Sequence, residues 1–70
     1  MTEYTVIIEK PTNNYLASVP DLPGVVAVGA TPEEAEAIIG EAIALHLRDL
    51  RRGGSIVPEP TTRALLVRVG

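Results

Sequence analysis

Few residues of this 70-residue chain could carry out chemistry, because it holds one histidine and no cysteine. His46 and Asp49 are three residues apart in a helical pattern, a spacing at which a carboxylate can orient an imidazole as a general base. No sequence signal brings Ser18 or Ser55 near His46, so a Ser-His-acid arrangement is not indicated. We therefore interpret His46 as an amphipathic residue at the edge of the core or at an oligomer contact.

A carboxylate cluster for metal chemistry is not indicated either. A two-metal site needs several acidic groups that converge on one or two ions. Glu9 falls on the first expected strand, next to Lys10, but the last expected strand holds no acidic residue. The glutamates of residues 33–41 fall on a helix surface or at its cap, and the glycines show no phosphate-loop spacing. We expect no catalytic residue, no metal, no cofactor and no enzymatic activity.

Size and composition indicate one small domain over residues 1–70. Hydrophobic residues make up 46% of the chain but aromatic residues only 3%, so the core is built from Val, Ile, Leu and Ala. Such a core is thin, and chains of this size often gain burial by oligomerising. We expect a homodimer or a higher homo-oligomer.

The charge balance is acidic, with a net charge of -3 and a pI near 4.9. A non-specific nucleic-acid binder needs a basic face, so we expect no direct nucleic-acid binding by this chain alone. The N-terminus shows no signal peptide, and no apolar run approaches the roughly 20 residues that span a bilayer. We expect a cytoplasmic protein that does not engage a membrane.

Three strands are expected in the first half of the chain, over residues 3–10, 15–19 and 25–28. The segments between them are rich in Asn, Pro and Gly, which favour turns, so the strands form an antiparallel meander. The second turn, from Pro20 to Pro23, has two interpretations. It is a rigid connection between strands, or its exposed Asp21 and Leu22 form a preorganised docking tip.

A helix is expected to begin at Thr31, whose hydroxyl can cap free N–H groups, with Pro32 at the first helical position and Glu34 completing a capping box. It is expected to end at the glycines 53 and 54. One broad apolar arc should cover the sheet. The arc comprises Ala35, Ile38, Ile39, Ala42, Ile43, Leu45, His46 and Leu50.

Residues 63–69 alternate as a last strand, with Leu65, Val67 and Val69 on one face. A helix that crosses from the third strand to a fourth gives an α+β two-layer sandwich, β-β-β-α-β, with one helix on a four-stranded sheet. One face of that sheet then has no cover within the monomer, and it is a candidate association surface. The apolar residues expected there are Ile7, Leu16, Leu66 and Val26 or Val28.

The ordered set of turn, strand, capped helix and proline-rich connector resembles the N-terminal domain of the HicB antitoxin family. The residues that carry the resemblance are Tyr15-Leu16-Ala17, Val19-Pro20-Asp21-Leu22-Pro23-Gly24, residues 29–35, Glu41-Ala42, His46-Leu47, Gly54 and Ile56-Val57-Pro58-Glu59-Pro60. The resemblance implies a truncated ribonuclease H-like fold with the last strand parallel beside the first. The chain departs from the family pattern at Val25, where many members have cysteine, and at Ile38 and Gly40.

The resemblance also implies a partner, since members of the family neutralise a small basic RNA-cleaving toxin, HicA, by covering its active site. Many members carry a further DNA-binding domain, which we do not expect here because the chain ends at Gly70. The resulting hypothesis is a stand-alone antitoxin. The alternative is an orphan oligomeric protein-interaction or regulatory domain of the same fold, without a toxin.

Overall fold

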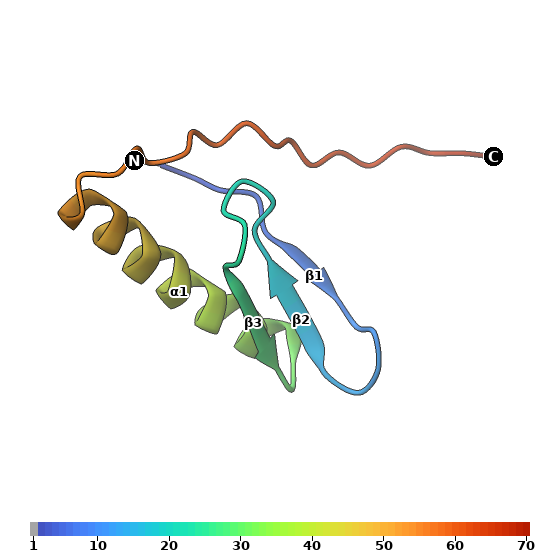
Figure 1. The fold of residues 1–70 in the computed structure, drawn as a ribbon. Coiled ribbons are helices and arrows are strands. Elements are labelled where there is room, and N and C mark those ends of the chain that lie inside the picture. Colours follow the sequence, from blue (N-terminus) through green and yellow to red (C-terminus); the bar gives the residue numbers. More distant parts are fainter. Residues whose placement is uncertain (1) are drawn as a thin grey trace.

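The computed structural model describes residues 2–70 and shows a three-stranded sheet with one helix across one of its faces (Figure 1). The strands are β1 (Ile7–Glu9), β2 (Tyr15–Ser18) and β3 (Val26–Gly29), and the helix is α1 (Pro32–Arg52). The sheet is antiparallel throughout, in the order β1-β2-β3. The predicted α+β class and the meander are confirmed, although β1 is shorter than residues 3–10.

The strand register separates the two faces of the sheet. Ile8, Ala17 and Ala27 lie opposite one another and belong to the core or pack against it, so this row faces α1. The neighbouring row begins at Ile7 and ends at Val26, and both of these side chains are exposed. Because successive side chains of a strand point to opposite faces, this second row lies on the face that α1 does not cover.

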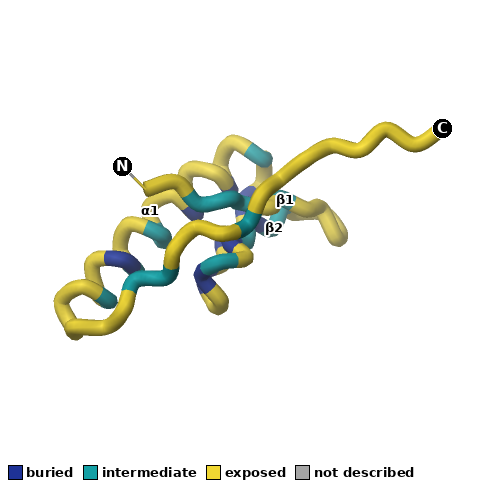
Figure 2. The backbone as a smooth tube through the Cα atoms, turned by 90° about the horizontal axis from the view of Figure 1, so that it is seen from above, coloured by how far each residue is buried: buried dark blue, intermediate teal, exposed yellow. Residues whose placement is uncertain are grey.

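The core lies between the sheet and the helix, where the buried positions of the chain gather (Figure 2). The buried side chains among residues 2–70 are small or aliphatic. The members of the core are Ala17, Val19, Leu22, Val25, Ala27, Ala35, Ile39 and Leu47. Among the described residues, the largest fully buried side chains are Leu22 and Ile39. The expected thin aliphatic core is confirmed.

The helix begins as the sequence predicts. Thr31 is the N-cap, and its hydroxyl oxygen accepts a hydrogen bond from the backbone N–H of Glu34 at 3.1 Å. The Glu34 carboxylate accepts from the backbone N–H of Ala30 at 3.0 Å, one residue before the cap. The capping interaction is therefore reciprocal. The Glu34 carboxylate accepts from the N–H of Ala30, whereas in the usual capping box it accepts from the N–H of the N-cap residue itself.

The helix ends in a Schellman motif, in which two backbone bonds satisfy its last carbonyls. The N–H of Ser55 donates to the carbonyl of Leu50 at 2.9 Å, and the N–H of Gly54 donates to that of Arg51 at 3.2 Å. Gly54 has a φ of +74°, in the left-handed region that glycine adopts without strain. The expected glycine stop is confirmed at Gly54.

The buried stripe of α1 differs in part from the predicted arc. Leu47 is buried, although it was not expected in the arc, while Ile38 and Leu45 are exposed. The sheet lies only against the narrower stripe that contains Ala35, Ile39 and Leu47, because a three-stranded sheet cannot cover an arc as broad as the sequence pattern suggests.

The expected fourth strand is not present in the described residues. Residues 63–69 form no ladder with the sheet, and all of their side chains are exposed. The C-terminal segment runs beside the N-terminal residues only as far as Thr62: the Tyr4 hydroxyl donates to the Pro58 carbonyl, and the Thr5 hydroxyl donates to the Thr62 carbonyl at 2.9 Å. Alternation predicts an extended conformation but not a pairing partner, which is why the prediction of a strand within the sheet was wrong.

Two glycine substitutions should have opposite effects on stability. A Cβ at Gly29 would lie 2.6 Å from the backbone nitrogen of Ala35, whereas one at Gly40, in the exposed part of α1, meets no atom within 4 Å. Gly29→Ala should lower the free energy of unfolding by about 1–3 kcal/mol, since the helix must move away from β3. Gly40→Ala should raise it by about 1 kcal/mol through helix propensity. Urea denaturation followed by circular dichroism measures both, and equal stabilities would contradict the close approach of β3 and α1.

Candidate functional site

One candidate surface is the sheet face that α1 leaves uncovered, which we call the open sheet face. It consists of Ile7, Leu16, Val26 and Val28. Ile7, Val26 and Val28 are 43%, 58% and 55% exposed, and Leu16, opposite Val28, is half-buried. Exposed apolar residues gathered on one face are typical of a protein-interaction site. The predicted positions of Ile7 and Leu16 on this face are confirmed, whereas Leu66 is not on it, since it lies in the extended C-terminal segment.

A second candidate surface is a shallow hollow between the β3 edge and the C-terminal half of α1, which we call the edge hollow. It is lined by Gly24, Val25, Val26, Ala42, Leu45, His46 and Asp49. Val26 belongs to both surfaces, so the open sheet face and the edge hollow meet at this residue. Together they offer apolar contact area on the sheet and polar groups on the helix.

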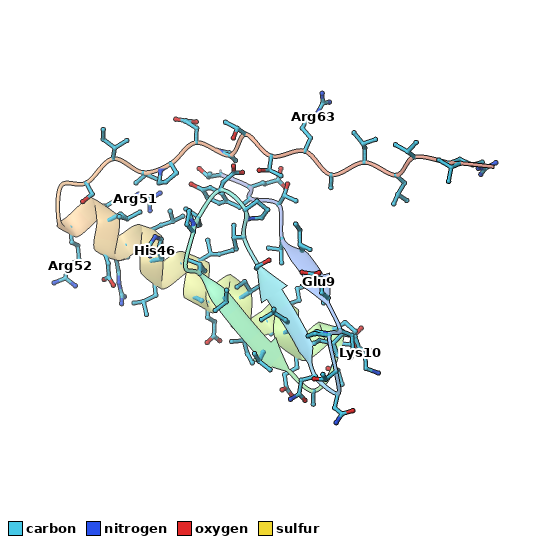
Figure 3. All side chains as sticks on the ribbon, turned by 45° about the vertical axis from the view of Figure 1, so that its right-hand side comes forward. Glu9, Lys10, His46, Arg51, Arg52 and Arg63 are labelled. Atoms are coloured by element: carbon cyan, nitrogen blue, oxygen red, sulfur yellow. The ribbon has the colours of Figure 1, made fainter. Side chains whose placement is uncertain are left out.

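His46 projects from the second half of α1 (Figure 3). It is half-buried and lines the edge hollow. Asp49 lines the same hollow, so the structure brings these two residues to one surface. Within residues 2–70, no hydrogen bond links their side chains. The half-buried placement agrees with an amphipathic residue at the edge of the core.

The turn between β2 and β3 is not the exposed tip that the sequence suggested. Leu22 is completely buried and belongs to the core, so the prediction of an exposed Leu22 was wrong. The backbone N–H of Leu22 donates to the Val19 carbonyl at 3.0 Å, and this tight turn directs the side chain inward. Pro20 and Pro23 remain exposed on either side. An apolar side chain in a small domain is worth more in the core than at a solvated tip.

Asp21, next to the buried leucine, binds the C-terminal segment. Its Oδ2 accepts hydrogen bonds from the backbone N–H groups of Thr61 and Thr62 at 3.1 and 3.0 Å. Its Oδ1 accepts from the hydroxyls of the same two threonines at 3.0 and 2.9 Å. Sequence reasoning missed this interaction, because 40 residues separate Asp21 from Thr61 and no local pattern links them.

These hydrogen bonds lower the pKa of the Asp21 carboxyl below its ordinary value of 3.8, the N–H of Thr62 contributing most, while desolvation acts in the opposite direction. A lowered pKa means that the carboxylate stabilises the folded state above pH 3.8 and that this contribution is lost as the pH falls through the folded-state pKa. We expect the amide proton shifts of Thr61 and Thr62 to titrate below pH 3.8, as followed by NMR. Asp21→Asn should abolish this titration, whereas Asp49→Asn should leave it unchanged, and persistence in Asp21→Asn would contradict the assignment.

No metal site or membrane span is apparent in the part of the chain that the structure describes. Residues 2–70 contain no group of three or more His, Cys, Asp or Glu side chains that could bind a metal ion. Among the same residues, no helix combines the length and the apolar character needed to cross a membrane.

The fold and the two surfaces define a class: a small α+β domain whose single helix covers one sheet face and leaves the other free for contact. The chain belongs to the family described as HicB_like antitoxin of bacterial toxin-antitoxin system, which matches residues 4–68. The family resemblance seen in the motif order of the sequence is therefore confirmed.

Two curated proteins are similar to the chain. An uncharacterised 14.9 kDa protein from the rep-hol intergenic region of Haemophilus phage HP1 is 36% identical over 56 residues, which is 80% of this chain and 42% of that protein. A UPF0150 protein of Helicobacter pylori is 52% identical over 44 residues, which is 63% of this chain and 61% of that protein. The chain thus spans about half the length of the curated relatives that it matches. No solved structure was found to match it.

Proposed function

We propose that this chain acts as an antitoxin that binds a small basic RNA-cleaving toxin of the HicA type and blocks access to the toxin's active site. The open sheet face is the observation that carries the proposal, since it exposes three aliphatic side chains that a partner could cover. Membership of the antitoxin family supports it over residues 4–68. Occlusion needs a contact surface and no catalytic group, which fits the surfaces described above.

The charge of the chain favours a basic partner. The net charge is -3, and Glu9 and Asp49 lie beside the two candidate surfaces, Glu9 opposite Leu16 and Asp49 in the edge hollow. A basic toxin would be attracted to these carboxylates during encounter, which raises the association rate and makes it sensitive to salt. Ile7 and Leu16 would then supply apolar contact.

Residues next to the open sheet face complete the proposed contact region. His46 would contribute from the edge hollow, and the exposed Pro20 and Pro23 would form a rigid border at the turn between β2 and β3. The buried Leu22 acts here only by supporting the turn.

The proposal includes self-association and a cytoplasmic location, where an RNA-cleaving partner would act. Self-association is supported by the thin core and by the apolar residues that the monomer leaves exposed. The same exposed residues also favour a second candidate function, an oligomeric interaction or regulatory domain without a toxin. A partner-free role would leave the open sheet face engaged only with further copies of this chain.

Co-expression tests the proposal directly. The chain and the product of an adjacent reading frame that encodes a small basic protein are produced together, and growth, RNA integrity and co-purification are measured. An antitoxin should restore growth, protect cellular RNA and purify with the basic protein in one complex. No complex and no restoration of growth would refute the antitoxin function and leave the partner-free role.

A further inference from the structure

The C-terminal segment, residues 63–69, is extended and, within residues 2–70, pairs with no strand of the sheet. It leaves the body of the domain and continues past the sheet in both views (Figures 1 and 2). Leu65, Val67 and Val69 alternate with other residues along it, and all three are exposed. Alternation of this kind is typical of a strand with one buried face, yet this chain buries neither face of the segment.

The outer edge of β1 is a free sheet edge with which such a segment could pair. Among residues 2–70, β1 pairs with β2 alone, so the outer backbone N–H and C=O groups of β1 have no ladder partner in that part of the chain. A free edge is a template for another strand. The domain therefore has an unpaired extended segment, residues 63–69, and an unpaired sheet edge, the outer edge of β1.

Hydrogen bonds set the direction in which the segment leaves the domain. Asp21 accepts four of them from Thr61 and Thr62. The Thr5 hydroxyl adds a bond to the Thr62 carbonyl. Because the chain is held up to Thr62 and then continues outward, residues 63–69 are directed away from the β1 strand of their own chain.

We propose that two copies of this chain exchange these segments: residues 63–69 of each copy pair with the outer edge of β1 of the other copy. Tyr4 contacts Pro58 and Thr5 contacts Thr62, so the C-terminal segment already runs parallel to the N-terminal residues. The exchanged strand keeps this parallel direction. Each copy gives one strand and receives one, so the arrangement closes as a two-fold symmetric dimer.

The side chains of residues 65–68 match those of β1 in polarity and charge. In parallel register, Leu65 and Val67 would face the helix layer beside Ile8, which packs against the core. Leu66 and Arg68 would lie on the other face, Leu66 beside Ile7 and Arg68 beside Glu9. An opposite-charge pair on neighbouring strands is favourable, and the apolar pair would extend the open sheet face by one residue.

The length of the segment is sufficient for this role. Seven residues in strand conformation span about 23 Å, which exceeds the length of the three-residue β1. Exchange at β1 leaves β3 and the edge hollow free, so a dimer of this kind can still present the surface assigned to a toxin.

Measurement of the native mass of the isolated chain, by light scattering after size exclusion, tests the exchange. We expect twice the chain mass of 7.4 kDa for the natural sequence and a monomer for Val67→Asp, because an unpaired carboxylate would enter the new interface. Ile56→Asp is the matched control: Ile56 is 92% exposed and lies outside the exchanged segment, so that variant should remain dimeric. A monomeric natural chain, or a dimer that Val67→Asp leaves intact, would overturn the proposal.

Cysteine pairing distinguishes exchange from other dimers, and the chain has no cysteine of its own to interfere. The single variants Glu9→Cys and Arg68→Cys are mixed, unfolded, refolded together and oxidised. A covalent species of twice the chain mass that contains one copy of each variant supports exchange, and its absence overturns it. In the double variant, a bridge within one chain would show that the segment folds back on its own β1 and would also overturn the proposal.

The inference rests on the self-association included in the proposed function, but its failure is separable from failure of the antitoxin activity. Mass and cysteine pairing are measured on the chain alone, without any partner. Toxin neutralisation by a monomeric chain would reject the exchange and keep the antitoxin function. An exchanged dimer that does not neutralise the toxin would keep the exchange and reject the antitoxin function.

Discussion

Leu22→Ala is expected to remove a large part of the protein's free energy of unfolding. Leu22, like Ile39, is a large side chain that is completely buried, and it fills the core from the turn between β2 and β3. Removing a buried leucine side chain costs about 3–5 kcal/mol. A domain of 70 residues has a total free energy of unfolding of only about 4–10 kcal/mol. Far-ultraviolet circular dichroism during urea and thermal unfolding measures the loss.

Leu45→Ala is the matched control for this substitution. It makes the same chemical change at a side chain of α1 that is half exposed, so we expect a loss of less than about 1 kcal/mol. Equal losses at the two positions would show that Leu22 does not support the core. An unchanged denaturation curve for Leu22→Ala would contradict the burial of Leu22 and indicate that the turn between β2 and β3 is exposed.

Val28→Glu is expected to abolish toxin neutralisation without unfolding the domain. Val28 lies on the open sheet face, opposite Leu16, and is 55% exposed, so the folded chain tolerates a carboxylate there. In a complex the same carboxylate would be buried among apolar groups without a partner. A penalty of about 3–5 kcal/mol corresponds to a loss of affinity of more than 100-fold. Calorimetric titration with the toxin and growth in the co-expression assay measure the effect.

Ile38→Glu is the control for the surface argument. Ile38 is a similarly exposed aliphatic residue on α1 that belongs to neither candidate surface. We expect full neutralisation by this variant. If Ile38→Glu fails while Val28→Glu succeeds, the toxin contacts the helix, and the open sheet face serves another partner.

The elements of the fold follow from local chemistry that can be read along the chain. The Thr31 cap with Glu34, the left-handed Gly54 and the apolar alternation that gives the meander all depend on neighbours a few residues away. Such interactions are local, so their sequence patterns predict them well. The order of motifs also identified the family, which the match over residues 4–68 confirms.

The placement of Leu22 and of the C-terminal segment could not be predicted in the same way. A leucine between two prolines has the same local pattern whether its side chain points into solvent or into the core. The structure buries it because the turn closes above the space between sheet and helix, where the scarcity of large side chains leaves room. Likewise, residues 63–69 are extended in the structure as their alternation predicts, but alternation does not determine what they pair with.

The sequence by itself therefore determined the kind of domain, its caps and turns, its thin aliphatic core and its family. Only the tertiary structure decided which surfaces are free. It placed Ile7 and Val28 on the face that α1 leaves open, and it tied Thr61 and Thr62 to Asp21 across 40 residues of chain or more. The physical reason is range: capping and alternation act over a few residues, whereas burial and the Asp21 hydrogen bonds join segments that only the folded chain brings together.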